Sequence, residues 1–314
     1  MNNKLQVSIQ TGDWYDDLFQ AETGVDKAFE FIKNCGFSVL DYNLDHTWYP
    51  AQISAGELPD FYNAEVEEIL EYYRPVKEAM NKHNISLGQA HAPFPTYVYD
   101  NQTINNYMIT VLEKNCAICQ YLGCPALVVH PYSNPDKEKE WDINIALYRQ
   151  LIPAAKKYGV KICLENMFLF NGHGVAGACA DAAEACRYID FLNAEAGENL
   201  FGFCLDIGHA NLCSRNIRNE IRVLGDRLTV LHIHDNNGVI DLHQIPYTQK
   251  CDWGKKTCTD WDGFIQGLRD INYTGTLNFE TYASCKGIPH ELVPSMLRLA
   301  HDVGEYFKKQ IEQS

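Results

Sequence analysis

Several features that define whole classes of protein are missing from this chain of 314 residues. No run of about eighteen apolar residues occurs, so we expect no helix that spans a membrane. The first residues turn acidic at once and lack the apolar core of a secretory signal, so we expect a cytoplasmic protein. In that compartment the 12 cysteines are expected to be reduced thiols rather than disulfides.

Positive charge is also scarce. The chain has 26 lysines and arginines against 41 aspartates and glutamates, which leaves a formal net charge of −15. Surfaces that bind nucleic acid are normally basic, so this deficit argues against a general affinity for nucleic acid. With 46% hydrophobic and 21% charged residues, the composition is that of a folded globular protein.

Eight short apolar runs alternate with longer segments of helical periodicity. The runs predict strands at 5–9, 38–43, 86–91, 126–131, 160–166, 201–209, 228–235 and 276–281. Helices are predicted at 65–83, 103–122, 141–158, 179–196, 260–271 and 290–311. Pro153 weakens the continuity of 141–158. Strands that alternate with helices form parallel sheets, and eight such repeats allow the sheet to close into a barrel.

The rival architecture is an open, doubly wound sheet, which would carry a glycine-rich phosphate-binding turn after its first strand. The sequence SIQTGDWYDD at 8–17 is not such a turn. No linker rich in proline or serine and no block of like charge divides the chain. We therefore predict an α/β fold, a single-domain (β/α)8 TIM barrel that spans residues 1–314.

Residues that commonly bind metal ions occur at the carboxyl ends of the predicted strands. They are His91, His130, Glu165, Asp206, His209, His232, His234, Asp235 and Glu280, and Asp241 with His243 follow in the loop after the seventh strand. Each of them alone has an ordinary explanation, such as a helix cap or a hydrogen-bonded histidine. In a closed barrel, however, these strand ends meet at one mouth, where packed carboxylates repel each other unless a cation compensates them. A mixed set of carboxylates and imidazoles suits Mn²⁺, Zn²⁺, Co²⁺ or Fe²⁺.

Four motifs appear in the order of the barrel strands. They are L-E-N at 164–166, C-L-D-I-G-H at 204–209, H-I-H-D-N at 232–236 and N-F-E-T at 278–281. As an ordered set they resemble the xylose isomerase-like TIM barrel superfamily, which contains sugar isomerases, ketose 3-epimerases, inosose dehydratases and endonuclease IV. The resemblance implies four metal ligands, which are Glu165, Asp206, His232 and Glu280. His232 is preferred to His234 because the ligand of the family lies three residues before an acidic position, here Asp235.

The endonuclease branch of the same superfamily has further metal ligands, and this chain matches them as well. The corresponding residues are His91, His130, His209, Asp241 and His243. They would hold a second and a third ion, or they would bind the hydroxyl groups of a substrate. The number of ions therefore stays open between one and three, and their identity stays open among Mn²⁺, Mg²⁺, Co²⁺ and Zn²⁺.

The isomerase and epimerase branch, which the motif D-L-H-Q-I-P-Y at 241–247 resembles more closely, implies a divalent-metal-dependent enzyme that acts on a sugar or sugar phosphate. In the implied mechanism Glu165 and Glu280 are catalytic and move a proton next to a carbonyl, the metal stabilises the enediolate, and His209 orients a substrate oxygen. One position departs from the pattern. Ketose 3-epimerases usually carry an arginine six residues after the metal-binding histidine, and Gly238 stands there.

Three alternatives to this activity remain open. They are a lyase similar to inosose dehydratase, a zinc phosphodiesterase similar to endonuclease IV, and a barrel that binds sugar without converting it. The phosphodiesterase would need cations to hold several phosphates. The loops after the first, second, third and fifth predicted strands contain no lysine or arginine, which counts against it and against a phosphorylated sugar.

The same loops are rich in aromatic residues. Such side chains would contact the apolar face of a sugar ring, or they would pack together as a lid. We predict that Trp14, Trp48 and Phe94, together with His209, bind a carbohydrate substrate. A homo-oligomer is compatible with the sequence, whereas a nucleic acid partner is not favoured.

Overall fold

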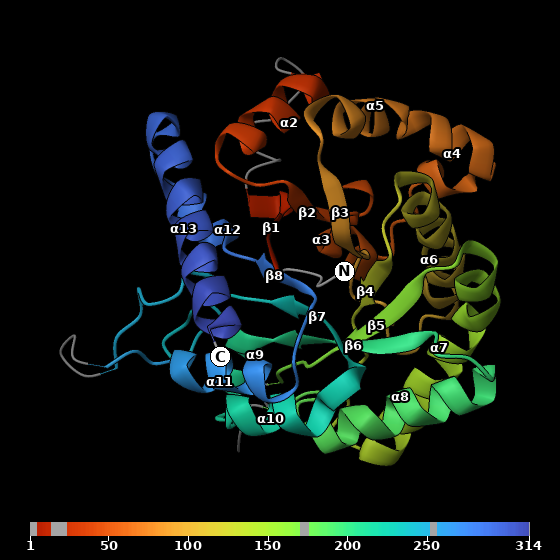
Figure 1. The fold of residues 1–314 in the computed structure, drawn as a ribbon. Helices are drawn as coiled ribbons and strands as arrows, with labels where there is room; N and C mark the ends of the chain where they lie inside the picture. The colour runs from red at the N-terminus through yellow and green to blue at the C-terminus, as the bar shows by residue number, and fades with distance from the viewer. Residues whose placement is uncertain (1–4, 14–23, 170–175, 252–255, 314) are drawn as a thin grey trace.

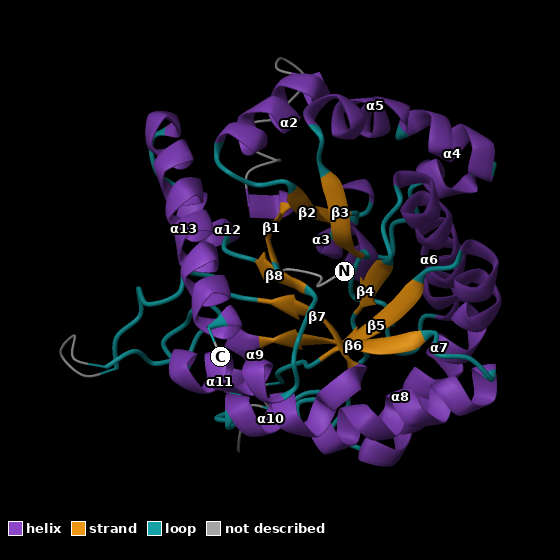
Figure 2. Cartoon of the chain, in the orientation of Figure 1, coloured by secondary structure: helices purple, strands orange, loops and turns teal. Residues whose placement is uncertain are grey.

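The computed structural model describes residues 5–13, 24–169, 176–251 and 256–313. Its centre is a sheet of eight parallel strands, and the helices lie around this sheet (Figure 1, Figure 2). The strands are β1 (Gln6–Gln10), β2 (Val39–Asn43), β3 (Ser86–His91), β4 (Ala126–Val129), β5 (Lys161–Glu165), β6 (Phe201–Asp206), β7 (Leu228–His232) and β8 (Thr276–Phe279).

The described α-helices follow these strands along the chain. They are α2 (Gly24–Asn34), α3 (Pro50–Ala55), α4 (Val66–Tyr72), α5 (Arg74–His83), α6 (Gln102–Leu122), α7 (Lys137–Tyr158), α8 (Ala182–Ala196), α9 (Ile207–Leu212), α10 (Ile217–Leu224), α11 (Trp261–Asp270), α12 (Tyr282–Cys285) and α13 (Val293–Glu312). None of them is long and apolar enough to cross a membrane.

The sheet closes on itself. Its strands are paired in the order β7-β6-β5-β4-β3-β2-β1-β8. The two edge strands also meet, because the amide of Ile233 donates to the carbonyl oxygen of Asn278 at 2.8 Å and the amide of Glu280 donates to that of Ile233 at 3.1 Å. The predicted (β/α)8 TIM barrel is therefore confirmed, and each of the eight predicted strands overlaps an observed one.

Proline explains why one predicted helix is divided into two, but a proline inside another helix does not interrupt it. The segment 65–83 forms two helices, α4 and α5, and Pro75 lies in the first turn of α5, where a missing amide hydrogen costs nothing. In contrast, α7 runs without a break through Pro153. Pro153 and Arg149 are both exposed, so water can satisfy the carbonyl group of Arg149 that the proline leaves without a donor.

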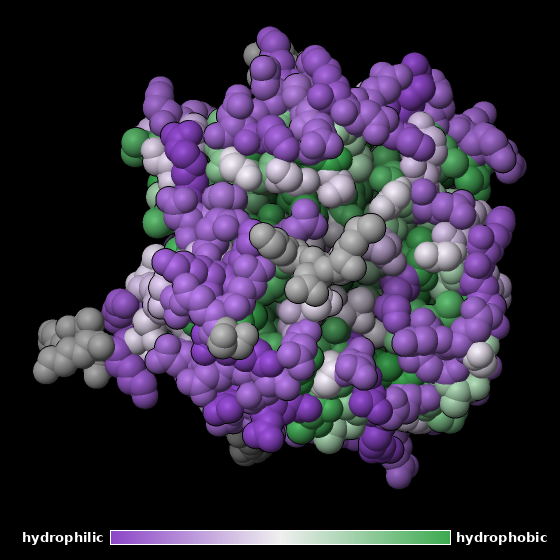
Figure 3. Space-filling model, viewed as in Figure 1, coloured by the Kyte–Doolittle hydropathy of each residue, from purple (hydrophilic) through white to green (hydrophobic). Residues whose placement is uncertain are grey.

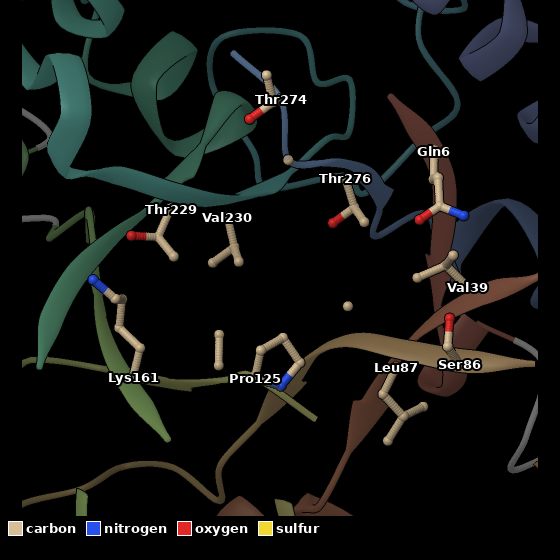
Figure 4. Close-up of a pocket in the computed structure, with 13 residues that line it drawn as sticks. Gln6, Val39, Ser86, Leu87, Pro125, Lys161, Thr229, Val230, Thr274 and Thr276 are labelled. Atoms are coloured by element: carbon tan, nitrogen blue, oxygen red, sulfur yellow. The ribbon is translucent and has the colours of Figure 1, made fainter. Parts of the chain in front are cut away.

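The two ends of the barrel differ in chemistry. A cluster of small buried side chains lies between the two ends and consists of Ala126, Val128, Cys163, Cys204 and Val230. At the amino ends of the strands lies a cavity of about 400 Å³, into which Ser86 and Thr276 point from the first residues of their strands (Figure 4). The predicted metal ligands belong to the opposite, carboxyl ends of the strands, where barrel enzymes place their active sites.

Helix α13 packs directly against the barrel at Gly304, where there is no room for a side chain. A methyl group there would lie 2.4 Å from Cγ1 of Val7 and 2.9 Å from Cε2 of Phe279. We expect Gly304→Ala to lower the free energy of unfolding by about 1–2 kcal/mol, because this clash outweighs the higher helix propensity of alanine. Circular dichroism should show a fall in Tm of roughly 2–6 °C. The exposed Glu305→Ala variant is the control, and an unchanged Tm for Gly304→Ala would contradict this packing.

Candidate active site

A cavity of about 610 Å³ opens at the carboxyl ends of the strands. The described residues that line it are Gln10, Gly12, Asn43, Asp45, Tyr49, His91, Phe94, His130, Glu165, Met167, Phe168, His209, Asp241, His243, Glu280, Tyr282 and Lys286. Asp206, His232 and His234 are fully buried and contact this lining. The cavity therefore contains or adjoins all nine residues that were predicted as metal ligands.

The first group of potential ligands surrounds Glu165, the last residue of β5. Its carboxylate is almost fully buried, and its Oε2 lies 3.2 Å from Nε2 of His130 and 3.8 Å from Nε2 of His91. The two imidazoles face each other, with their Nε2 atoms 2.9 Å apart. Side chains from β3, from the residue after β4 and from β5 thus converge on one point.

The second group joins β5 to β6, β7 and β8. Nδ1 of His232 lies 3.3 Å from Oε2 of Glu165, 3.2 Å from Oε2 of Glu280 and 4.0 Å from Oδ2 of Asp206. The structure therefore brings together the four residues that the resemblance implies as one metal site. Their role as ligands remains a prediction.

The third group lies around Asp241, in the loop after β7. Oδ2 of Asp241 lies 2.8 Å from Nε2 of His243 and 3.5 Å from Nε2 of His209. His234, two residues after His232, points into the same region, and its Nε2 lies 3.1 Å from Asp206 and 3.6 Å from Oδ1 of Asp241. The three groups thus form a continuous cluster across the mouth.

His234 is the residue that the sequence analysis undervalued. Alternate residues of an extended chain point to the same side, so the H-I-H spacing already implies that His232 and His234 both face the barrel interior. The side chain of Asp235, the residue after His234, does not point into the cavity. Its carboxylate accepts hydrogen bonds from Oγ1 of Thr259 at 2.7 Å and from the amide of Gln249 at 3.1 Å, which orders the loop rather than the cavity.

Backbone carbonyl groups orient three of the histidines. Nδ1 of His91 pairs with the carbonyl oxygen of Ala92 at 2.9 Å, that of His209 with Asn166 at 2.8 Å, and that of His243 with Glu280 at 3.1 Å. A carbonyl oxygen only accepts, so each Nδ1 must carry the hydrogen in these contacts. When such a ring is neutral, its lone pair is on Nε2 and faces the group, as in a metal-binding histidine.

The buried polar atoms of the site fit a divalent cation. Oε2 of Glu165, Nδ1 of His232, Nδ1 of His234 and Oδ1 of Asp241 are buried without a hydrogen-bond partner among the described residues. Such orphaned atoms are costly in a folded protein unless another partner satisfies them. A cation would accept lone pairs from the oxygen and imidazole atoms and would compensate the clustered carboxylates.

The carboxylates and imidazoles strongly perturb each other. Burial opposes the ionisation of Glu165, but the neighbouring His232 and His130 outweigh it and hold the pKa of this carboxyl well below its usual range. Burial likewise opposes the charge on His209, but Asp206 and Asp241 overcome this effect and raise its pKa to about 10. Protons on histidines therefore balance the carboxylates, and a metal ion would displace such protons when it binds.

Aromatic side chains form the walls of the cavity. The ring of Phe94 lies 4.8 Å from that of His130, and the ring of Phe168 lies 4.9 Å from that of His209, measured between centroids. Tyr282 covers His243 at 4.5 Å, and Lys286, the only lysine or arginine among the described lining residues, lies over Tyr282. Within the described lining, the cavity is thus acidic at its base, aromatic at its sides and poor in lysine and arginine.

One of the predicted substrate-binding residues is not part of this wall. Trp48 is fully buried, donates from Nε1 to the carbonyl oxygen of Glu57 at 2.8 Å and packs against Tyr107. The prediction for Trp48 is therefore corrected to a packing role, because the short helix α3 that begins at Pro50 turns its neighbour Tyr49 toward the cavity instead. Trp14 lies outside the described residues.

A polar residue at the end of β1 was not predicted. Gln10 is buried, and its Nε2 donates to Oε1 of Glu280 at 3.1 Å, which holds that carboxylate in place. The same rule that identified Glu165 would have found it, since Gln10 is also a polar residue at the carboxyl end of an apolar run.

The fold and the site together define the class of this protein. It is a closed (β/α)8 barrel with a candidate metal centre of carboxylates and imidazoles at the carboxyl ends of its strands. Residues 29–301 match the family model described as "Xylose isomerase-like TIM barrel", and the chain belongs to this family. The resemblance that the motifs suggested is thereby confirmed.

Three proteins with similar sequences or structures can be compared with this chain. The protein y4fM of Sinorhizobium fredii (strain NBRC 101917 / NGR234) is 23% identical over 295 residues, which cover 85% of this chain and 82% of the relative. The D-psicose 3-epimerase of Enterocloster bolteae is 28% identical over 149 residues, or 48% of this chain and 42% of that enzyme. The crystal structure of D-allulose 3-epimerase from Methylomonas sp. superposes with a TM-score of 0.69 at 17% identity and covers 98% of each chain.

Proposed function

We propose that the protein is a divalent-metal-dependent sugar isomerase or epimerase that moves a proton next to a carbonyl group. The observation that carries this proposal is the meeting of Glu165 and Glu280. Their Oε2 atoms approach the same nitrogen of His232, from β5 and from the residue after β8, and both carboxylates line the cavity. Two of the similar proteins are sugar 3-epimerases, and this likeness supports the same activity for this chain.

The two glutamates have the chemistry that such a reaction needs. One carboxylate takes the proton from the carbon next to the carbonyl, and the electron pair of that C–H bond becomes the C=C bond of an enediolate, with the negative charge on the former carbonyl oxygen. The other residue, as a carboxylic acid, returns a proton to the opposite face of that carbon or to the neighbouring carbon. A divalent cation bound by Glu165, Asp206, His232 and Glu280 would stabilise negative charge on oxygen as a Lewis acid.

The walls of the cavity favour a sugar without several phosphate groups. Phe94 and Phe168 offer apolar faces, and Asn43, Asp45 and Gln10 offer polar groups for hydroxyls. Lys286 is the single cationic side chain in the described lining, whereas phosphates are normally held by several cations or amides. Gly238, at the position where ketose 3-epimerases carry arginine, has φ 74° and donates its amide to Asn236, so this chain would hold the substrate differently.

A second candidate function rests on the third group of ligands. His209, Asp241 and His243 converge next to His234, so the cluster has enough ligands for more than one ion. Several zinc ions at one mouth would suit a phosphodiesterase, which the superfamily also contains. The scarcity of cations around the cavity argues against this alternative, because a nucleic acid backbone would find little to bind. Cleavage of DNA with abasic sites by the metal-loaded protein would establish it.

Exchange of hydrogen with solvent tests the proposed isomerase or epimerase directly. The protein, loaded with Mn²⁺ and then freed of excess ion, is incubated in D₂O with D-fructose, D-psicose, D-tagatose and L-ribulose, and the sugars are analysed by mass spectrometry and NMR. We expect deuterium at the carbon next to the carbonyl together with a new isomer. Conversion without deuterium incorporation, or the absence of both for every sugar of this class, would contradict the proposal.

A further inference from the structure

A buried carboxylate lies beneath the candidate metal centre, in the middle of β2. Asp41 is completely buried, and three side chains from other strands donate to its Oδ2. These donors are Nδ2 of Asn278 at 2.9 Å, Nε2 of Gln89 at 3.1 Å and Nε2 of His232 at 3.2 Å. Nothing in the sequence motifs singles out this residue, since a charged side chain inside an apolar strand has no spacing that marks it.

Stability alone does not explain this residue. Removing a carboxylate from water costs several kcal/mol, and only a well-placed positive partner offsets that cost. No lysine or arginine among the described residues forms an ion pair with Asp41, and the side chain that does is His232. Oδ1 of Asp41 is also buried and has no hydrogen-bond partner in the part of the chain that the structure describes. A neutral side chain with all its polar atoms hydrogen-bonded would stabilise the packing of β2 more than this carboxylate does.

His232 connects this carboxylate to the site. One ring nitrogen, Nε2, faces Asp41, while the other, Nδ1, faces the carboxylates of Glu165 and Glu280 at 3.3 and 3.2 Å. A carboxylate only accepts a hydrogen bond, so the contact with Asp41 requires a hydrogen on Nε2. When the ring is neutral, its lone pair is then on Nδ1 and points into the ligand group.

We propose that Asp41 is a positioning residue for metal binding. It accepts the hydrogen bond from Nε2 of His232, fixes the orientation and tautomer of the ring, and makes Nδ1 a stronger donor to a divalent cation. This inference rests on the metal site proposed above. Partners of this kind are usual for metal-binding histidines, and their loss typically weakens metal affinity about 10–100-fold.

The environment of His232 differs from that of three other histidines in the site. His91, His209 and His243 are each oriented by a neutral backbone carbonyl, and each presents Nε2 to its group. His232 is oriented by a carboxylate and presents Nδ1. The charge of Asp41 strengthens the bond and raises the basicity of the ring, so His232 should be a stronger imidazole ligand than these three histidines.

The first test compares Mn²⁺ affinity, measured by the EPR signal of the free ion, for the wild-type protein and Asp41→Asn. Asparagine keeps the shape and can still accept the hydrogen bond, but it lacks the charge. We expect the dissociation constant to rise about 10–100-fold. Ser8→Ala is the matched control, because Ser8 donates to Oδ1 of Asn278 in the same network at 2.9 Å but does not touch His232. Its affinity should stay within about twofold of the wild type.

A double-mutant cycle separates positioning from general damage to the fold. If Asp41 acts through His232, Asp41→Asn should have almost no further effect on Mn²⁺ affinity in a protein that already carries His232→Gln. Additive losses would show that Asp41 acts by another route. A wild-type protein that binds no Mn²⁺ overturns the proposed metal site and this inference with it, whereas equal affinities of the wild type and Asp41→Asn overturn the role of Asp41 alone.

A second measurement needs no variant and decides the question if Asp41→Asn does not fold. Long-range ¹H–¹⁵N NMR of the wild-type protein loaded with Zn²⁺ reports which nitrogen of each histidine carries hydrogen. We expect His232 to carry it on Nε2, opposite to His91, His209 and His243, which should carry it on Nδ1. Hydrogen on Nδ1 of His232 in the Zn²⁺-loaded protein would overturn the proposal.

Discussion

Replacing Glu165 with glutamine is expected to lower kcat by about 10³-fold or more while the barrel stays folded. Glutamine has nearly the same shape, but its amide neither takes a proton nor supplies negative charge. At this position both losses act together, since Oε2 of Glu165 faces His130, His91 and His232 at once. The measurement is turnover of whichever sugar shows deuterium exchange, with the fold checked by circular dichroism.

The control for this variant is Glu198→Gln. Glu198 is exposed and pairs with Lys156 at 3.2 Å on the surface, so its neutralisation should leave both turnover and Tm close to the wild type. Glu280→Gln adds a second comparison. If the two glutamates serve opposite faces of the substrate, one variant should retain hydrogen exchange without forming product. A fully active Glu165→Gln enzyme would eliminate the proposed mechanism.

Removing divalent ions with a chelator is expected to abolish activity and to destabilise the protein. Glu165, Asp206, Asp241 and Glu280 then lie close together with only protonated histidines to balance them. Adding Mn²⁺ to about 100 times its dissociation constant should restore activity and add about 2.7 kcal/mol to the free energy of unfolding. For a chain of this length the corresponding rise in Tm is roughly 5–10 °C, measurable by thermal unfolding.

The stoichiometry of the bound metal distinguishes the groups of ligands. One tightly held ion per chain would fit the group of Glu165, Asp206, His232 and Glu280. If more ions bind, Asp241→Asn should lower the count, because Asp241 joins His209 and His243 in the third group. Activity and Tm that do not respond to chelation and Mn²⁺ would contradict the metal centre.

Most of the site was accessible from the sequence because its residues end apolar runs. Glu165 and Asp206 are the last residues of β5 and β6, and Glu280 follows β8 directly. Hydrophobic periodicity marks where such strands end, and barrel closure then brings the ends together. The role of Asp41 was not accessible, because it depends on distances between side chains of different strands.

The aromatic residues of the loops show that composition alone does not predict which side chains line the cavity. Phe94 and Trp48 were equally good candidates in the sequence, both aromatic and both in loops without lysine or arginine. Phe94 lines the cavity beside His130, whereas Trp48 is fully buried and packs against Tyr107. Which side of a loop faces the site depends on how that loop packs, and loop conformation has no periodic pattern from which it can be predicted.

The sequence by itself determined the barrel, the places where its strands end and the residue types that gather there. It did so because alternating apolar patterns, turn residues and the closure of eight repeats are local or strongly constrained properties. Only the tertiary structure decided that Glu165 and Glu280 approach the same nitrogen of His232 and that Asp41 lies on its other side. Those contacts join residues far apart in the chain, and their distances follow from strand register and side-chain packing, which no local pattern encodes.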